Sequence, residues 1–76
     1  MKWRQIPKKL ESGKVDMVLQ VKKWWMISWF DCWYFYLENG KKHWQRLTTD
    51  LDYPPHIENI SKDNLYYKIF GIYFKI

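Results

Sequence analysis

The sequence has a single cysteine, three glycines, three prolines and no alanine. One cysteine excludes a disulfide framework, so a reducing, cytoplasmic compartment is expected. With so few glycines the chain has no glycine-rich phosphate loop, no nucleophile elbow and no dinucleotide fingerprint. The first nine residues contain no apolar run of the kind that a signal peptide carries. Catalytic activity is therefore not expected.

Residues that could bind a metal ion are few and badly spaced. Cys32, His43 and His56 match no zinc signature, and neither a metal nor another cofactor is expected. Cys32 lies in an apolar run, which predicts a buried and unreactive thiol. Asp50 and Asp52 are expected to be solvated in a turn. A lone carboxylate among aromatic residues, such as Asp31, is expected at a bulge, at an edge, or paired with Lys or Arg.

The chain of 76 residues is long enough for one domain, and its 13 Lys and Arg outnumber its 8 Asp and Glu. A net charge of +5 favours a polyanionic partner, although ordinary solubility explains such a charge equally well. The absence of alanine, with abundant Lys, Ile, Tyr and Phe, resembles the bias of AT-rich genomes such as those of phages and mobile elements.

Residues 24–37 form an unusual run in which eight of the fourteen side chains are aromatic. Trp, Tyr, Phe and Ile suit the pleated surface of a sheet, which favours a strand. Fourteen residues exceed the usual length of a strand, so an interruption is expected at Ser28 or at Asp31–Cys32. A helix is the alternative, because apolar side chains also recur at helical spacing. The run is too short to span a membrane and contains a carboxylate, so a membrane partner is unlikely.

Asn39-Gly40 is the strongest local signal, because both residues tolerate the positive φ of a two-residue hairpin turn. The resulting register puts Phe35 opposite Trp44 on an apolar face that is expected to be mostly buried. Arg46 is expected to lie over Trp33 on that same face. The opposite face would carry polar-tipped rings and face water.

The remaining segments complete a small β-domain. Residues 1–13 are interpreted as a basic arm or a short edge element, and 15–21 as a strand with one buried face. Residues 48–56 are expected to form a loop, and 61–64 a turn or a helix N-cap. Residues 65–76 change the parity of their apolar positions at Gly71, which predicts a strand with a bulge there. A helix ending at Gly71 is the alternative.

The fold class predicted is therefore mostly β, either a small antiparallel sheet or a partly open SH3-like or OB-like barrel of four to five strands. One domain, 1–76, would consist of the basic arm 1–13 and a β core over 14–76.

Basic residues interleaved with rings favour a non-catalytic module that binds single-stranded nucleic acid. The alternative is a small accessory or inhibitor protein, of a phage or mobile-element type, that binds a host protein through exposed rings. The same residues are the candidates in both cases: Tyr34, Tyr36, His43, Lys22, Lys23, Lys41, Lys42 and Arg46.

Overall fold

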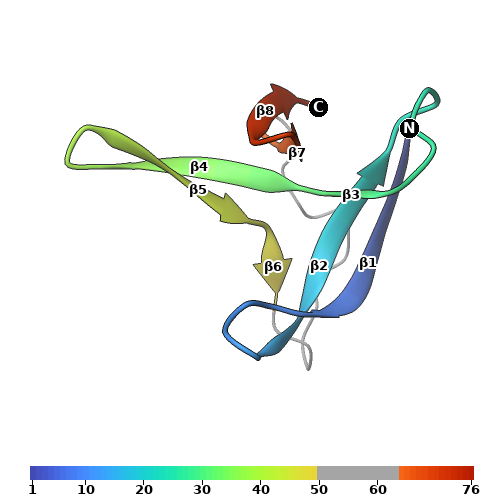
Figure 1. Cartoon of the computed structure of the whole chain (residues 1–76), viewed down its shortest axis with the longest axis horizontal. Helices are drawn as coiled ribbons and strands as arrows, with labels where there is room; N and C mark the ends of the chain where they lie inside the picture. The colour runs from blue at the N-terminus through green and yellow to red at the C-terminus, as the bar shows by residue number, and fades with distance from the viewer. Residues whose placement is uncertain (50–63) are drawn as a thin grey trace.

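The computed structural model describes residues 1–49 and 64–76, and strands are the only regular elements in these two ranges (Figure 1). The strands pair in two four-stranded antiparallel sheets. The first sheet has the order β1-β2-β3 with β6 also paired to β2, and the second has the order β5-β4-β7-β8. The eight strands are β1 (Lys2–Lys9), β2 (Val15–Lys22), β3 (Phe30–Asp31), β4 (Trp33–Glu38), β5 (Lys41–Arg46), β6 (Thr48–Thr49), β7 (Tyr66–Ile69) and β8 (Ile72–Lys75).

The prediction of a small, mostly antiparallel β-domain is confirmed. The strands are shorter and more numerous than the four or five expected, because two bent segments, 30–38 and 41–49, each contribute a strand to both sheets. The bends lie at Cys32 and Leu47. There the amide of Cys32 donates to the carbonyl of Leu19 at 2.9 Å, and the amide of Leu47 donates to the carbonyl of Cys32 at 2.8 Å. These backbone bonds tie the two sheets together at one corner.

The hydrophobic core lies at this corner. Leu19, Val21, Cys32 and Leu65 are almost fully buried and pack together. Four partly buried side chains pack against them: Trp3, Tyr34, Leu47 and Ile76.

Residues 2–9 form the edge strand β1, which confirms the edge-element interpretation of this segment and not the basic arm. Their pairing with β2 runs from Lys2 opposite Lys22 to Lys9 opposite Val15. Packing of Trp3 against the core supports this strand. Pro7 is tolerated because an edge strand has one side without sheet hydrogen bonds.

Strand β2 is confirmed, but the expectation that only one of its faces is buried is wrong. Leu19 and Val21 face the core, and Val18 and Gln20 on the opposite face are also buried. The reason is that β2 is the central strand of the first sheet, and side chains of its neighbours flank the second face on both sides. Gln20 bonds to Arg4 and Asp31, and Val18 lies between Ile6 and Thr48.

The aromatic run is a strand only from Phe30 onward, so the strand prediction is wrong for residues 24–29, and the expected interruption at Asp31–Cys32 is confirmed. Residues 24–29 form turns and bends, β3 follows, and Cys32 separates β3 from β4. The turn begins where the amide of Met26 donates to the carbonyl of Lys23 at 3.0 Å.

The Asn39-Gly40 turn and its register are confirmed. Asn39 has φ 54 and Gly40 has φ 76, and Phe35 pairs with Trp44. The hairpin face that carries Phe35 and Trp44 was expected to be mostly buried, and this is only half correct. Both rings are partly buried, and Leu37 on the same face is 67% exposed.

The bulge predicted at Gly71 is a hairpin turn. Phe70 has φ 50 and Gly71 has φ 78, and Ile69 pairs with Ile72 across them. A two-residue turn changes the parity of apolar positions just as a bulge does, because odd residues of β7 pair with even residues of β8. The helix alternative is excluded by the same pairing.

Thr48 and Thr49, expected to begin a loop, pair with β2 as the short strand β6. Residues 50–56 of that loop and residues 61–63 of the predicted turn lie outside the described residues, as do His56, Asp50 and Asp52.

Replacing Gly40 by Ala should lower the free energy of unfolding by about 1 kcal/mol, because Ala at positive φ is strained. No atom within 4 Å would meet the added methyl group, so the conformation alone causes the loss. Urea unfolding followed by tryptophan fluorescence measures the effect. Lys41→Ala, one residue along, is the control and should change the stability by less than about 0.5 kcal/mol. Equal stability of both variants would contradict the strain argument.

Candidate functional site

Strand alternation gathers five aromatic rings on one face of the second sheet. Phe35 pairs with Trp44, Trp33 pairs with Tyr66, and Tyr73 pairs with Lys68 on that same face. We call this surface the aromatic face. Its five rings, Trp33, Phe35, Trp44, Tyr66 and Tyr73, are all partly buried.

The rings form one contact network. Trp44 stacks on Tyr73 with a centroid distance of 3.7 Å and an interplanar angle of 2°, and Tyr66 lies edge-on to Trp44 at 4.9 Å. Trp44 belongs to β5 and Tyr73 to β8, which are the two edges of the sheet. The contact between them therefore requires the sheet to curl over this face. Trp33 joins the network edge-on to Tyr73 at 5.7 Å.

Cations lie over these rings. The Lys42 ammonium is 4.6 Å from the Phe35 centroid, and the Lys68 ammonium is 5.1 Å from the Trp33 centroid. The expected contact of Arg46 with Trp33 is confirmed at 5.0 Å. The second-sheet residues that share this face contain no carboxylate. Asp31 and Glu11 compensate the charge of Arg46. Lys42 and Lys68 leave the aromatic face positive.

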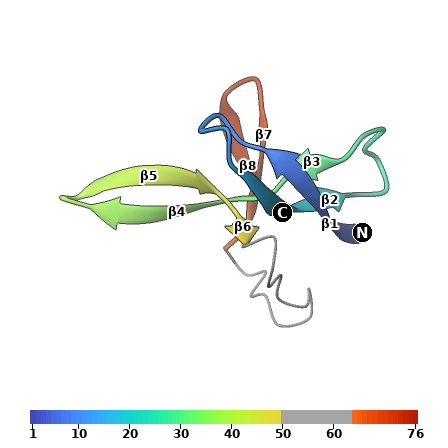
Figure 2. The same ribbon diagram turned by 90° about the horizontal axis from the view of Figure 1, so that it is seen from below.

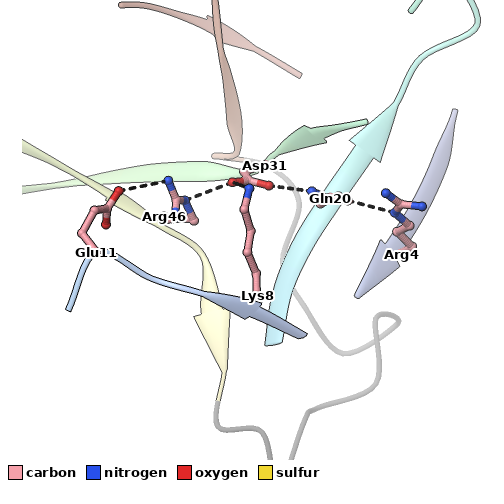
Figure 3. A network of polar contacts seen from close by, with 6 residues as sticks. All are labelled: Arg4, Lys8, Glu11, Gln20, Asp31 and Arg46. Carbon is pink, nitrogen blue, oxygen red and sulfur yellow. Dashed lines mark hydrogen bonds and ion pairs between the residues drawn. The ribbon is translucent and has the colours of Figure 1, made fainter. Parts of the chain in front are cut away.

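Arg46 is fixed by the carboxylate of Asp31, which lies between Arg46 and Gln20 (Figure 3). Only 11% of the Asp31 side chain is exposed. Lys8 Nζ donates to Asp31 Oδ2 at 2.9 Å, and Gln20 Nε2 donates to Oδ1 at 2.7 Å. Arg46 Nε forms an ion pair with Oδ2 at 3.1 Å, although its angle is not that of a hydrogen bond. The expected pairing of Asp31 with Lys or Arg is confirmed.

The network extends in both directions from Asp31. Gln20 Oε1 accepts from Arg4 Nε at 2.8 Å, and the Arg4 guanidinium lies 4.3 Å from the Trp29 centroid. On the other side, Arg46 Nη2 is 3.5 Å from Glu11 Oε1 in the β1–β2 loop. Arg46 is thus held between two carboxylates beside an indole ring.

Two clefts flank Trp33. One, of about 290 Å³, lies between the aromatic face and the loop that joins β1 to β2. The other, of about 270 Å³, lies toward Trp29, Phe30 and Lys68.

The predicted binding residues do not form one surface. Lys42 and Arg46 lie on the aromatic face, whereas Tyr36 and His43 stack on the opposite face with centroids 5.4 Å apart. Tyr34 packs against the core. Lys41 follows the hairpin turn, and Figures 1 and 2 place that turn and the Lys22–Lys23 end of β2 at opposite ends of the molecule.

Sequence reasoning did not include Trp33, Trp44, Tyr66, Tyr73 or Lys68 in the candidate set, because this face was expected to be core. The interleaving of Lys42 and Arg46 with the rings was the signal against that expectation, since a closed core rarely holds cations.

A second exposed apolar feature lies in the turn between β2 and β3. Trp24 is 92% exposed and Ile27 is 97% exposed, whereas Met26 between them is 5% exposed and anchors the turn. The cleft beside it, of about 310 Å³, is lined in part by Lys2, Lys22 and Lys23.

The thiol of Cys32 is fully buried. Burial, and then the neighbouring charge of Asp31, raise its pKa to about 12. The prediction of a buried thiol is confirmed, and at neutral pH the group stays protonated and unreactive. Within residues 1–49 and 64–76, no three His, Cys, Asp or Glu side chains cluster in a way that could hold a metal ion.

Comparison with protein-family models, with curated proteins and with solved structures finds no match to this chain. In the described ranges, no helix has the length and apolar character needed to cross a membrane.

Replacing Asp31 by Asn should lower the free energy of unfolding by about 1–3 kcal/mol, because Arg46 and Lys8 lose the charge that compensates theirs. Asn keeps the shape of the side chain and can still accept from Gln20. Thermal unfolding by circular dichroism measures the loss. Glu38→Gln removes a carboxylate that is 61% exposed and 4.0 Å from His43, and it should leave the stability almost unchanged. Equal effects of the two substitutions would show that the network contributes nothing.

Proposed function

We propose that the protein is a non-catalytic module that binds single-stranded nucleic acid on the aromatic face. The observation that supports the proposal is the combination of five partly buried rings with cations that lie over them and no carboxylate among the strand residues of that face. Single-stranded nucleic acid is bound by this combination, because bases stack on rings while cations contact phosphates. The net charge of +5 favours the same class of partner. A cytoplasmic location, which the single cysteine favours, would agree with binding to nucleic acid.

The positions of the cations suggest how binding would proceed. Lys42 and Lys68 cover ring faces in the free protein. Their long side chains can turn toward phosphates, which uncovers the ring faces for bases. Arg46 is different, because Asp31 holds its guanidinium beside Trp33. Lys42 and Lys68 would therefore provide the phosphate contacts, while Arg46 stays beside Trp33 in the wall of the cleft.

Affinity for a fluorescent single-stranded oligonucleotide should fall with salt, with a log–log slope of about −0.7 for each phosphate neutralised. Lys68→Ala should reduce that slope, and Trp33→Ala should cost on the order of 1–3 kcal/mol of binding if a base stacks there. Fluorescence anisotropy at low and moderate salt measures both effects, and circular dichroism checks that each variant folds.

Two controls locate the site. Lys2→Ala removes the same charge from β1 of the first sheet, away from the aromatic face, and should leave the slope unchanged. Tyr36→Ala removes a ring from the opposite face and should leave the affinity unchanged. A loss with Tyr36→Ala but not with Trp33→Ala would place the contact on the opposite face. No binding at low salt would discard the proposal.

The exposed β2–β3 turn favours a second candidate function, an accessory or inhibitor protein that binds a host protein. Trp24 and Ile27 project from a turn that is braced, because the amide of Lys23 donates to Met26 Sδ at 3.2 Å and Trp25 lies edge-on to Tyr67 at 6.0 Å. A braced turn loses little entropy on binding, and tryptophan is enriched among the residues that dominate interfaces.

Trp24→Ser should abolish retention of a host protein from nuclease-treated lysate while leaving oligonucleotide binding intact. The side chain of Trp24 is almost fully exposed, so the variant should fold normally. The retained protein must then bind the purified chain in the same way by calorimetry. Retention that is equal with and without Trp24 would discard this candidate.

A further inference from the structure

The cleft of about 290 Å³ beside the aromatic face has features that the proposed function does not use. Its walls come from the β1–β2 loop on one side and from β4, β5 and β6 on the other. Trp33, Trp44 and Leu10 supply apolar surface, and Glu11, Gln45 and Arg46 supply polar groups. A small cleft with an aromatic wall and a few polar groups is the usual form of a site for one flat ligand.

Two of the polar groups are opposite charges held side by side. Arg46 is fixed over Trp33 and against Asp31, and only 18% of its side chain is exposed. Its contact with Glu11 is long, at 3.5 Å, and the Glu11 side chain is 88% exposed. Among the described residues, Oε2 of Glu11 has no partner, and Oε1 has only the long contact with Arg46, so both oxygens can still accept hydrogen bonds from a ligand.

A carboxylate whose two oxygens can both accept matches a ligand that offers two adjacent N–H donors. Guanine is the common base that carries two such donors on one edge, the ring N1–H and the exocyclic 2-amino group. Cytosine and adenine offer one exocyclic amine, and thymine and uracil offer one ring N–H. Guanine also carries the O6 and N7 acceptors that arginine binds best among the bases.

We infer that this cleft binds a single guanine base of the nucleic-acid strand, with Glu11 accepting from N1–H and the 2-amino group while the base stacks against the indole wall. The inference rests on the proposed function, because it assigns a base preference to the same surface. It makes Glu11 a specificity-determining residue in a face that otherwise binds any base.

The test compares fluorescent oligothymidines of about 12 nucleotides, within the site size of small single-strand binders. One series carries a single central guanine, and matched series carry adenine, cytosine or hypoxanthine at that position. Guanine should tighten binding about tenfold over thymine, within the range for one bidentate base contact. Hypoxanthine lacks only the 2-amino group and should lose most of that gain.

Glu11→Gln should bring the affinities for the guanine and thymine oligonucleotides together, because a side-chain amide has only one acceptor oxygen. Glu38→Gln makes the same charge change outside the cleft and should keep the tenfold preference. Binding of every oligonucleotide with equal affinity would overturn the inference and leave the proposed function intact. A preference that survives in Glu11→Gln, or that hypoxanthine reproduces in full, would also overturn it. Absence of all binding would overturn both.

Discussion

The carboxylate of Asp31 is the contact on which the arrangement of the two sheets depends. It lies at the corner where β3 passes into β4, and its partners come from three other strands: Lys8 from β1, Gln20 from β2 and Arg46 from β5. A carboxylate that is largely withdrawn from water must be compensated, since an unpaired buried charge costs several kcal/mol. That requirement fixes how the second sheet is placed against the first. It also explains why the chain keeps a charged residue inside its most aromatic segment.

The same corner separates two environments along one bent strand. Cys32 and Tyr34 point toward the apolar core, and Asp31 and Trp33 point toward the polar network and the aromatic face. A chain of this size cannot bury sixteen aromatic side chains in one core. It instead packs several of them against each other and against cations on a half-open surface. Those rings contribute to stability and remain available for contact, so one set of side chains supports both the fold and the proposed binding.

Features set by local chemistry could be predicted from the sequence, and features set by distant contacts could not. The Asn39-Gly40 turn depends on two residues that tolerate positive φ, and the register of β4 with β5 follows from it. The change at Gly71 from apolar odd positions to apolar even positions marked the right place in the chain. It could not distinguish a bulge from a two-residue turn, because both shift the alternation of apolar residues by one position. The contact of Trp44 with Tyr73 depends on curling of a whole sheet, which no local pattern encodes. The pattern of the strands alone therefore predicts core on the aromatic face, and it places the candidate rings Tyr34, Tyr36 and His43 on the opposite face.

Pro7 in the outer strand β1 has a consequence for how this chain behaves at high concentration. A strand at the border of a sheet can recruit a strand from another molecule through its unused backbone groups, and aromatic-rich sheets are prone to such association. Proline has no N–H to offer, and it is accommodated in a strand with its nitrogen directed away from the neighbouring strand. Lys9, at the end of the same strand, adds a charge that repels the like charge of a second copy. The border of the first sheet is therefore a poor template for fibril growth.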